Sequence, residues 1–178
     1  YHMPTPFERM VSAMNPQLIT EAYRAIGSLT PLKSDCGRLC GAACCSESDA
    51  GEGMLLLPGE ETLLPPGHGR YLSPAELPRF GPALLYVCPD SCDRAFRPLA
   101  CRIFPLAPRR MKGGRFSTQM DARGRPVCPL ARQSRQALDP AFIQAVEDAF
   151  ALLAQDEEYA RYLTALDALV REYARFTL

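Results

Sequence analysis

Eight cysteines in a chain of 178 residues constrain how this sequence folds more than any other feature. Seven fall into two local groups and one stands apart: Cys36, Cys40, Cys44 and Cys45; Cys88, Cys92 and Cys101; and Cys128. Local clustering of this kind is typical of metal ligands, and in a reducing compartment such thiols are rarely disulfides. The pattern predicts metal binding by thiolates, and the alternative is an exported protein held by disulfides.

Composition and the N-terminal residues indicate a protein of the cytoplasm. Hydrophobic residues make up 47% of the chain, enough for a core, and 20 basic residues balance 20 acidic ones, which favours no class of partner. No apolar run approaches a membrane span, and Glu8 and Arg9 stand where a signal peptide has an apolar stretch. We therefore expect a soluble, cytoplasmic protein that makes no contact with a membrane.

Helices are predicted at both ends of the chain. Asn15-Pro16 is typical of a helix start within the segment 4–30, and Asp139-Pro140 starts the helical segment 139–176. Apolar residues then recur with a helical period. The positions expected on the buried faces are Ile19, Ala22, Tyr23 and Ile26, then Phe142, Val146, Phe150 and Leu153, then Tyr159, Leu163, Leu166, Leu169, Val170 and Tyr173.

Short strands and turns are predicted between the helices. Strands are expected at 54–57 and 83–87, a short helix starting with the capping box at 73–76, and a hairpin from 103–111 and 115–120 around Lys112-Gly113-Gly114. The expected fold is α+β, with an irregular cysteine-rich, metal-stapled centre packed by N- and C-terminal helices. We expect a single domain over 3–178, made of N-terminal helices (4–30), a metal-binding core (32–135) and C-terminal helices (139–176).

The spacing of the first cysteine group leaves its geometry open. Intervals of four residues suit one face of a helix for Cys36, Cys40 and Cys44, whereas Gly37 and Gly41 favour a loop that turns the sulfurs inward. The adjacent side chains of Cys44 and Cys45 diverge in most backbone conformations. Either one of these two thiols is spare or they serve two metals, so one four-cysteine site and two remain alternatives, with zinc or iron as the metal.

Charge is unevenly distributed along the chain. The segment 94–135 carries eleven basic residues and one acid, Asp121, whereas the segment 35–93 carries nine acids and three basic residues. Guanidinium groups near the second cysteine group would favour deprotonated thiols. The alternative is a solvated hairpin face paired with acidic helices. Nucleic-acid binding is disfavoured because aromatic residues are not regularly interleaved with the charges and no known motif is present.

The second cysteine group lies in a longer signature. The segment Cys92-Asp-Arg-Ala-Phe-Arg97-Pro98-Leu-Ala-Cys101-Arg102-Ile-Phe104-Pro105 contains the pattern R-P-x-x-C-R-x-F/Y-P, and the Cys44-Cys45 doublet precedes it. This combination resembles the YkgJ-type cysteine-cluster family, whose members are described as zinc- or iron-chelating domains. The resemblance covers 36–105, and the first group is spaced more loosely here than the C-x2-C form common in the family.

The resemblance implies a set of metal ligands. Carried onto this sequence, the family's cysteines are Cys36, Cys40, Cys44, Cys45, Cys88, Cys92 and Cys101. Cys128 lies outside the signature but is included as a candidate ligand. Arg97 and Arg102 flank Cys101, and we expect them to hydrogen-bond to sulfur or to Asp93; a surface pair of arginines is the alternative.

Other carboxylates near the cysteines are candidate auxiliary ligands, although acids that favour turns are the ordinary explanation for all of them. They are Asp35, Asp49, Glu60, Glu61, Asp90 and Asp93.

Three functions remain compatible with these features. The first is a metal-binding protein that uses the thiolate cluster for storage, delivery or structure, alone or with a protein partner. The second is an iron-sulfur redox protein or enzyme, with methyl transfer implied by the family's resemblance to flagellin lysine N-methylases. The third is a thiol redox sensor at Cys44-Cys45. No catalytic residue is predicted, because the two histidines, His2 and His68, lie in no recognisable catalytic arrangement.

Overall fold

The computed structural model describes residues 14–45, 53–64, 71–87 and 96–176 of the chain. They form a mixed α+β structure, which confirms the predicted class. The helices are α2 (Pro16–Ile26), α3 (Gly37–Cys40), α4 (Leu99–Ile103), α5 (Pro140–Leu153) and α6 (Glu157–Phe176). The strands are β1 (Met54–Leu55), β2 (Tyr71–Leu77), β3 (Gly81–Val87), β4 (Leu106–Arg110) and β5 (Phe116–Met120).

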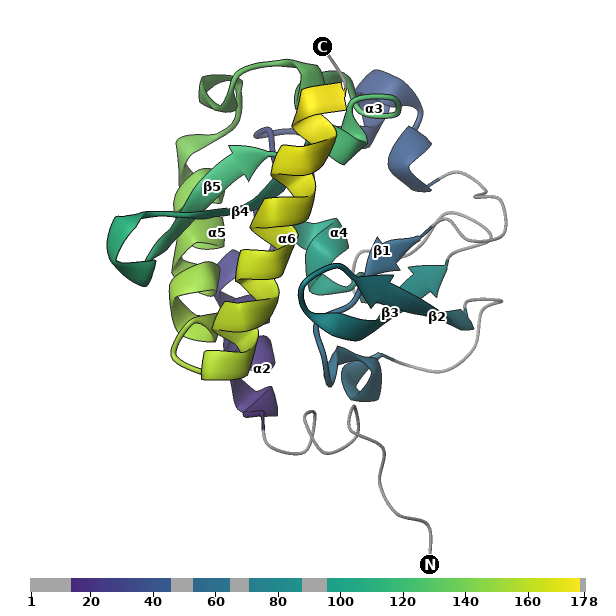
Figure 1. Ribbon diagram of the computed structural model, residues 1–178. Helices are drawn as coiled ribbons and strands as arrows, with labels where there is room; N and C mark the ends of the chain where they lie inside the picture. Colours follow the sequence, from purple (N-terminus) through teal and green to yellow (C-terminus); the bar gives the residue numbers. More distant parts are fainter. Residues whose placement is uncertain (1–13, 46–52, 65–70, 88–95, 177–178) are drawn as a thin grey trace, which may run out of the picture.

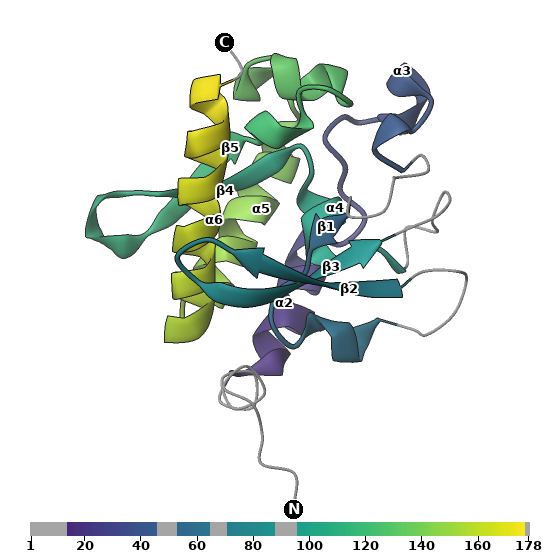
Figure 2. The same cartoon turned by 45° about the vertical axis from the view of Figure 1, so that its right-hand side comes forward.

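The strands make two antiparallel units on either side of α6. One is a three-stranded sheet in the order β1-β3-β2, and the other is the β4–β5 hairpin. Figure 1 shows α6 crossing the front of the molecule between them, and the hairpin lies between α6 and α5 (Figure 2). Helix α2 packs along α5. A single helix therefore contacts both β units.

The helix starts predicted at Asn15-Pro16 and Asp139-Pro140 are confirmed. The Asn15 side chain accepts a hydrogen bond from the Gln17 amide at 3.1 Å, and Asp139 accepts one from the Ala141 amide at 2.9 Å. In each case the cap precedes a proline at the first helical position, where its missing N–H costs nothing.

Most residues of the predicted apolar faces are buried in the core. The α5 face is fully buried and packs against α2, and Tyr159 and Leu163 at the start of α6 are buried as well. Tyr23 and Leu169 are partly buried against the core, and Tyr173, near the end of α6, is 48% exposed. No helix among the described residues is long and apolar enough to cross a membrane.

The segment 73–76, predicted to start a helix, lies in strand β2. Every residue of β2 pairs with β3, from Tyr71 opposite Val87 to Leu77 opposite Gly81. Strand β2 is at the edge of the sheet, where Pro74 is tolerated because one side of the strand needs no ladder hydrogen bonds. Pairing with the next strand of the hairpin therefore overrides the local capping pattern.

The hairpin is confirmed, but it begins later than predicted. Ile103 ends helix α4, and β4 starts only at Leu106, after Phe104 and Pro105. The segment before Pro105 is therefore a short helix rather than the first part of a strand. This places Cys101 on a helix that precedes the hairpin.

Candidate metal centre

Cysteines from both sequence groups line one cavity of about 360 Å³. Cys44 lies in the 3-10 turn Ala43–Cys45, and Cys101 lies in α4. Its lining also includes Arg97, Phe104, Asp121, Arg123 and Gly124. The cavity therefore joins two segments that are far apart in the sequence.

A second cavity, of about 270 Å³, is lined by Cys36 together with Cys44 and Arg97. Cys44 and Arg97 therefore line both cavities. Three of the predicted cysteine ligands lie around this pair of cavities, and the guanidinium-bearing side chain of Arg97 is common to both. Positive charge near a thiol favours the thiolate, which is the form that binds metal.

The backbone conformation of the first cysteine group decides between the two predicted geometries, a shared helix face and a loop. Helix α3 ends at Cys40, because Gly41 adopts a left-handed conformation with φ 61°. Ala42 follows with φ 58°, so the chain turns before Cys44. Cys36, Cys40 and Cys44 consequently do not share one helix face. The structure has the turn that the glycines favour, which brings Cys44 to the cavity.

Helix α4 presents Cys101 because its other face is anchored in the core. Leu99 and Ile103 are buried one helical turn apart, and Cys101, between them, is half-buried beside the cavity. Pro98 precedes the helix in an extended conformation, and its carbonyl accepts hydrogen bonds from the amides of Cys101 and Arg102. The Pro-x-x-Cys-Arg part of the signature thus builds one short, anchored helix.

A buried carboxylate ties this helix to two other parts of the chain. Glu60 is fully buried and accepts hydrogen bonds from the amides of Leu57 (2.9 Å) and Leu99 (2.6 Å) and from the hydroxyl of Tyr23 (2.5 Å). Burial raises the pKa of the Glu60 carboxyl, and the three donated hydrogen bonds oppose this. Burial, and then the charge of Glu60, raise the pKa of Tyr23. We call Glu60 and its three donors the Glu60 latch.

The Glu60 latch shows that Glu60 has a structural role. The sequence indicated a turn-forming acid or an auxiliary ligand, and Glu60 does begin the 3-10 turn Glu60–Leu63. Both of its oxygens, however, accept hydrogen bonds within the protein.

Arg102 packs against the Glu60 latch. Its guanidinium carbon lies 4.5 Å from the centre of the Tyr23 ring, and its Nε donates to the Arg97 carbonyl at 2.7 Å. These contacts orient Arg102 along α2, whereas Arg97 lines the cavities. Asp93, the third residue predicted to support the site, lies outside the described residues.

An ion pair that the sequence analysis did not select also lines the cavity. Asp121, which is buried, accepts hydrogen bonds from the Arg123 guanidinium at 2.9 and 2.6 Å. Burial lowers the pKa of Arg123, but the hydrogen bonds and charge of Asp121 outweigh this and raise it. The sequence feature that could have identified this pair is that Asp121 is the one acid in the basic segment 94–135.

Gly124 makes room for an aromatic wall of the cavity. A Cβ atom at this position would lie 2.6 Å from two carbons of the Phe104 ring. We predict that Gly124→Ala pushes this ring into the cavity, weakening metal binding while costing about 1–3 kcal/mol of stability. Competition with a chromogenic chelator and thermal unfolding would measure the two effects. Unchanged metal affinity in a folded variant would show that the ring does not border the site.

The remaining predicted ligands are placed as follows. Cys40 is half-buried at the end of α3, and Cys128 is 8% exposed within the hydrophobic core. The side chain of Cys45, and all of Cys88 and Cys92, lie outside the described residues. Among the residues that are described, no three histidine, cysteine or acidic side chains are grouped closely enough to hold a metal. The described part of the cavity supplies Cys44 and Cys101.

Comparisons with family models, curated proteins and solved structures found no match. The resemblance to the YkgJ-type family therefore remains a prediction that rests on the signature residues.

Proposed function

We propose that the chain is a metal-binding protein that holds zinc or iron through cysteine thiolates at the cavity lined by Cys44 and Cys101. The observation that carries this proposal is that one cavity takes a cysteine from each sequence group. Soft thiolates suit zinc and iron-sulfur centres, and such centres draw their ligands from separate segments.

The surroundings of the two cysteines support the proposal. Arg97 and the Asp121–Arg123 ion pair give the cavity fixed charges, and Phe104 gives it an apolar wall. Groups around a metal centre control the charge of its ligands and their access to water. The R-P-x-x-C-R-x-F/Y-P signature supports the same assignment, because its cysteine is Cys101.

The ligand set that we propose is Cys44, Cys101 and members of the second group, Cys88 and Cys92. Cys128 is left out, because it packs among apolar side chains and is not among the residues that line the cavity. When bound, the metal would staple the cysteine-rich segments to the α+β core. Clustered thiols that are not joined in disulfides are typical of a reducing compartment, and we therefore propose that the protein is cytoplasmic.

Metal analysis by mass spectrometry, with a visible spectrum, tests the proposal on protein purified without oxygen. Stoichiometric zinc in a colourless sample would support a chelating or structural centre. Iron with acid-labile sulfide in a brown sample would support an iron-sulfur protein. Absence of metal from protein that is purified without oxygen and reconstituted with zinc or with iron would contradict metal binding. Disulfide bonds or free-thiol chemistry would then be the explanation for the cysteines.

A further inference from the structure

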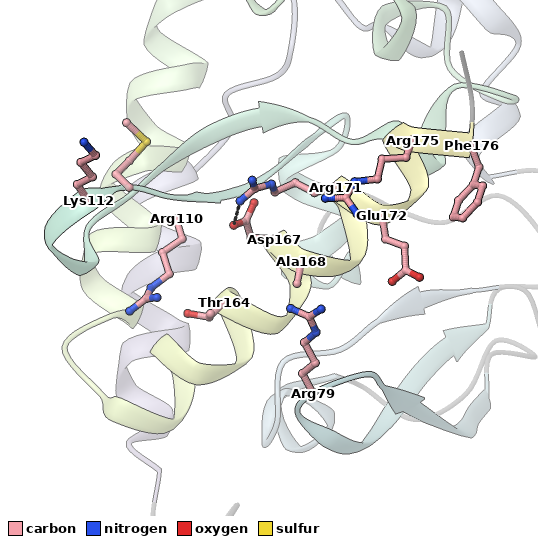
Figure 3. Close-up of a pocket in the computed structure, with 11 residues that line it drawn as sticks. Arg79, Arg110, Lys112, Thr164, Asp167, Ala168, Arg171, Glu172, Arg175 and Phe176 are labelled. Carbon is pink, nitrogen blue, oxygen red and sulfur yellow. Dashed lines mark ion pairs between the residues drawn. The ribbon is translucent and has the colours of Figure 1, made fainter.

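A basic groove of about 640 Å³ lies along the outer face of α6 (Figure 3). Its floor includes Thr164 and Ala168, and its sides are the β4–β5 hairpin and the turn between β2 and β3. In Figure 3 the Arg110 guanidinium lies near Thr164 and that of Arg79 near Ala168, on opposite sides of the helix. Small floor residues leave space between these two arginines.

Positive charge dominates the groove. Among the described residues that line it, the cations are Arg79, Arg110, Lys112, Arg171 and Arg175, and the acids are Asp167 and Glu172. Asp167 is buried and already engaged, since it accepts a hydrogen bond from Gln119 at 2.8 Å and lies 3.7 Å from the Arg171 guanidinium. The groove therefore keeps an excess of cations from three separate elements.

Arg79 occupies a backbone position that normally favours glycine. It has φ 70°, and the Phe80 amide donates to the Leu77 carbonyl across the turn. With Pro78 before it, Arg79 is at the third position of a type II turn, which requires a positive φ. A non-glycine residue in this region is strained, and such strain concentrates at functional sites.

Both sides of the groove are fixed to its floor. Phe80 is buried, and its ring meets that of Tyr162 edge-on at 5.2 Å. On the other side, Gln119 donates to both the Pro108 carbonyl and Asp167, each at 2.8 Å. The cations are therefore presented by a preformed surface, which reduces the entropy that a ligand must lose on binding.

We propose that this groove binds a small ligand with two or more linked phosphate groups, recognised through its phosphate chain. Guanidinium groups match phosphate oxygens with paired hydrogen bonds. Arg79 and Arg110 stand on opposite sides of α6, so a chain of phosphates suits them better than one phosphate does. The volume is in the range of small-molecule sites.

Isothermal titration calorimetry with inorganic tripolyphosphate and with ATP, both without magnesium, tests the proposal. We expect both to bind and Arg79→Gly to weaken binding about tenfold or more, with an unchanged or higher melting temperature because glycine relieves the strain. Arg110→Ala should weaken binding similarly. Arg109→Ala is the matched control, since Arg109 is exposed on the same strand but does not line the groove.

No binding of either ligand would overturn the proposal, and so would binding of ATP without tripolyphosphate. Equal weakening by Arg109→Ala and Arg110→Ala would overturn it as well, because it would indicate attraction by net charge alone. Because polyphosphates chelate metals, metal content is measured before and after titration. Heat that arises only from loss of metal would also contradict the proposal, and it would leave the cysteine site itself supported.

Discussion

Glu60→Ala should destabilise the folded protein by about 3–5 kcal/mol, because it leaves buried donors without an acceptor. The amides of Leu57 and Leu99 and the hydroxyl of Tyr23 would all lose the hydrogen bonds of the Glu60 latch. Urea unfolding followed by far-ultraviolet circular dichroism would measure the change in the free energy of unfolding.

The neighbouring Glu61 provides the matched control. It is half-buried, and one of its carboxylate oxygens, Oε2, has no hydrogen-bond partner. Glu61→Ala should therefore change stability by less than about 1 kcal/mol. Equal effects of the two substitutions would show that stability is lost because the turn 60–63 has lost an acidic residue, and not because the hydrogen bonds of the Glu60 latch are broken.

On the proposed ligand set, Cys101→Ala should abolish metal binding almost completely. Loss of a group that merely supports a metal ligand weakens binding by about 10–100-fold, so loss of a ligand should cost more. Cys128→Ala, the matched control, should keep the metal because Cys128 packs in the hydrophobic core and is not among the residues that line the cavity. Metal content per folded chain, checked by circular dichroism, is the measurement. Full metal content in Cys101→Ala, or its loss in Cys128→Ala, would contradict the proposed ligand set.

Local rules were sufficient for the helices but not for the sheet. Asn15 and Asp139 cap their helices with atoms only two residues away, so their sequence pattern carries the whole interaction. The segment 73–76 has an equally good local pattern for a helix. Its conformation is set instead by β3, and strand pairing depends on neighbours that a local pattern does not contain.

In the candidate site, too, the sequence predicted what depends on local pattern and did not predict contacts between separate segments. The signature selected Cys101, and in the structure this residue and Cys44 line the same cavity. The latch was not foreseen, because Tyr23, Glu60 and Leu99 come from three distant segments. Spacing along the chain identifies residues with suitable chemistry, whereas the contacts between them depend on the tertiary fold.

The position of α6 between the two β units has a consequence for synthesis on the ribosome. Both the β2–β3 unit and the β4–β5 hairpin precede this helix in the chain, so neither has its shared packing surface until α6 has emerged. Leu166 of α6 also lines the cavity. A nascent chain therefore exposes Cys44 and Cys101 before the cavity that they line is complete, and these thiols are open to oxidation during that interval.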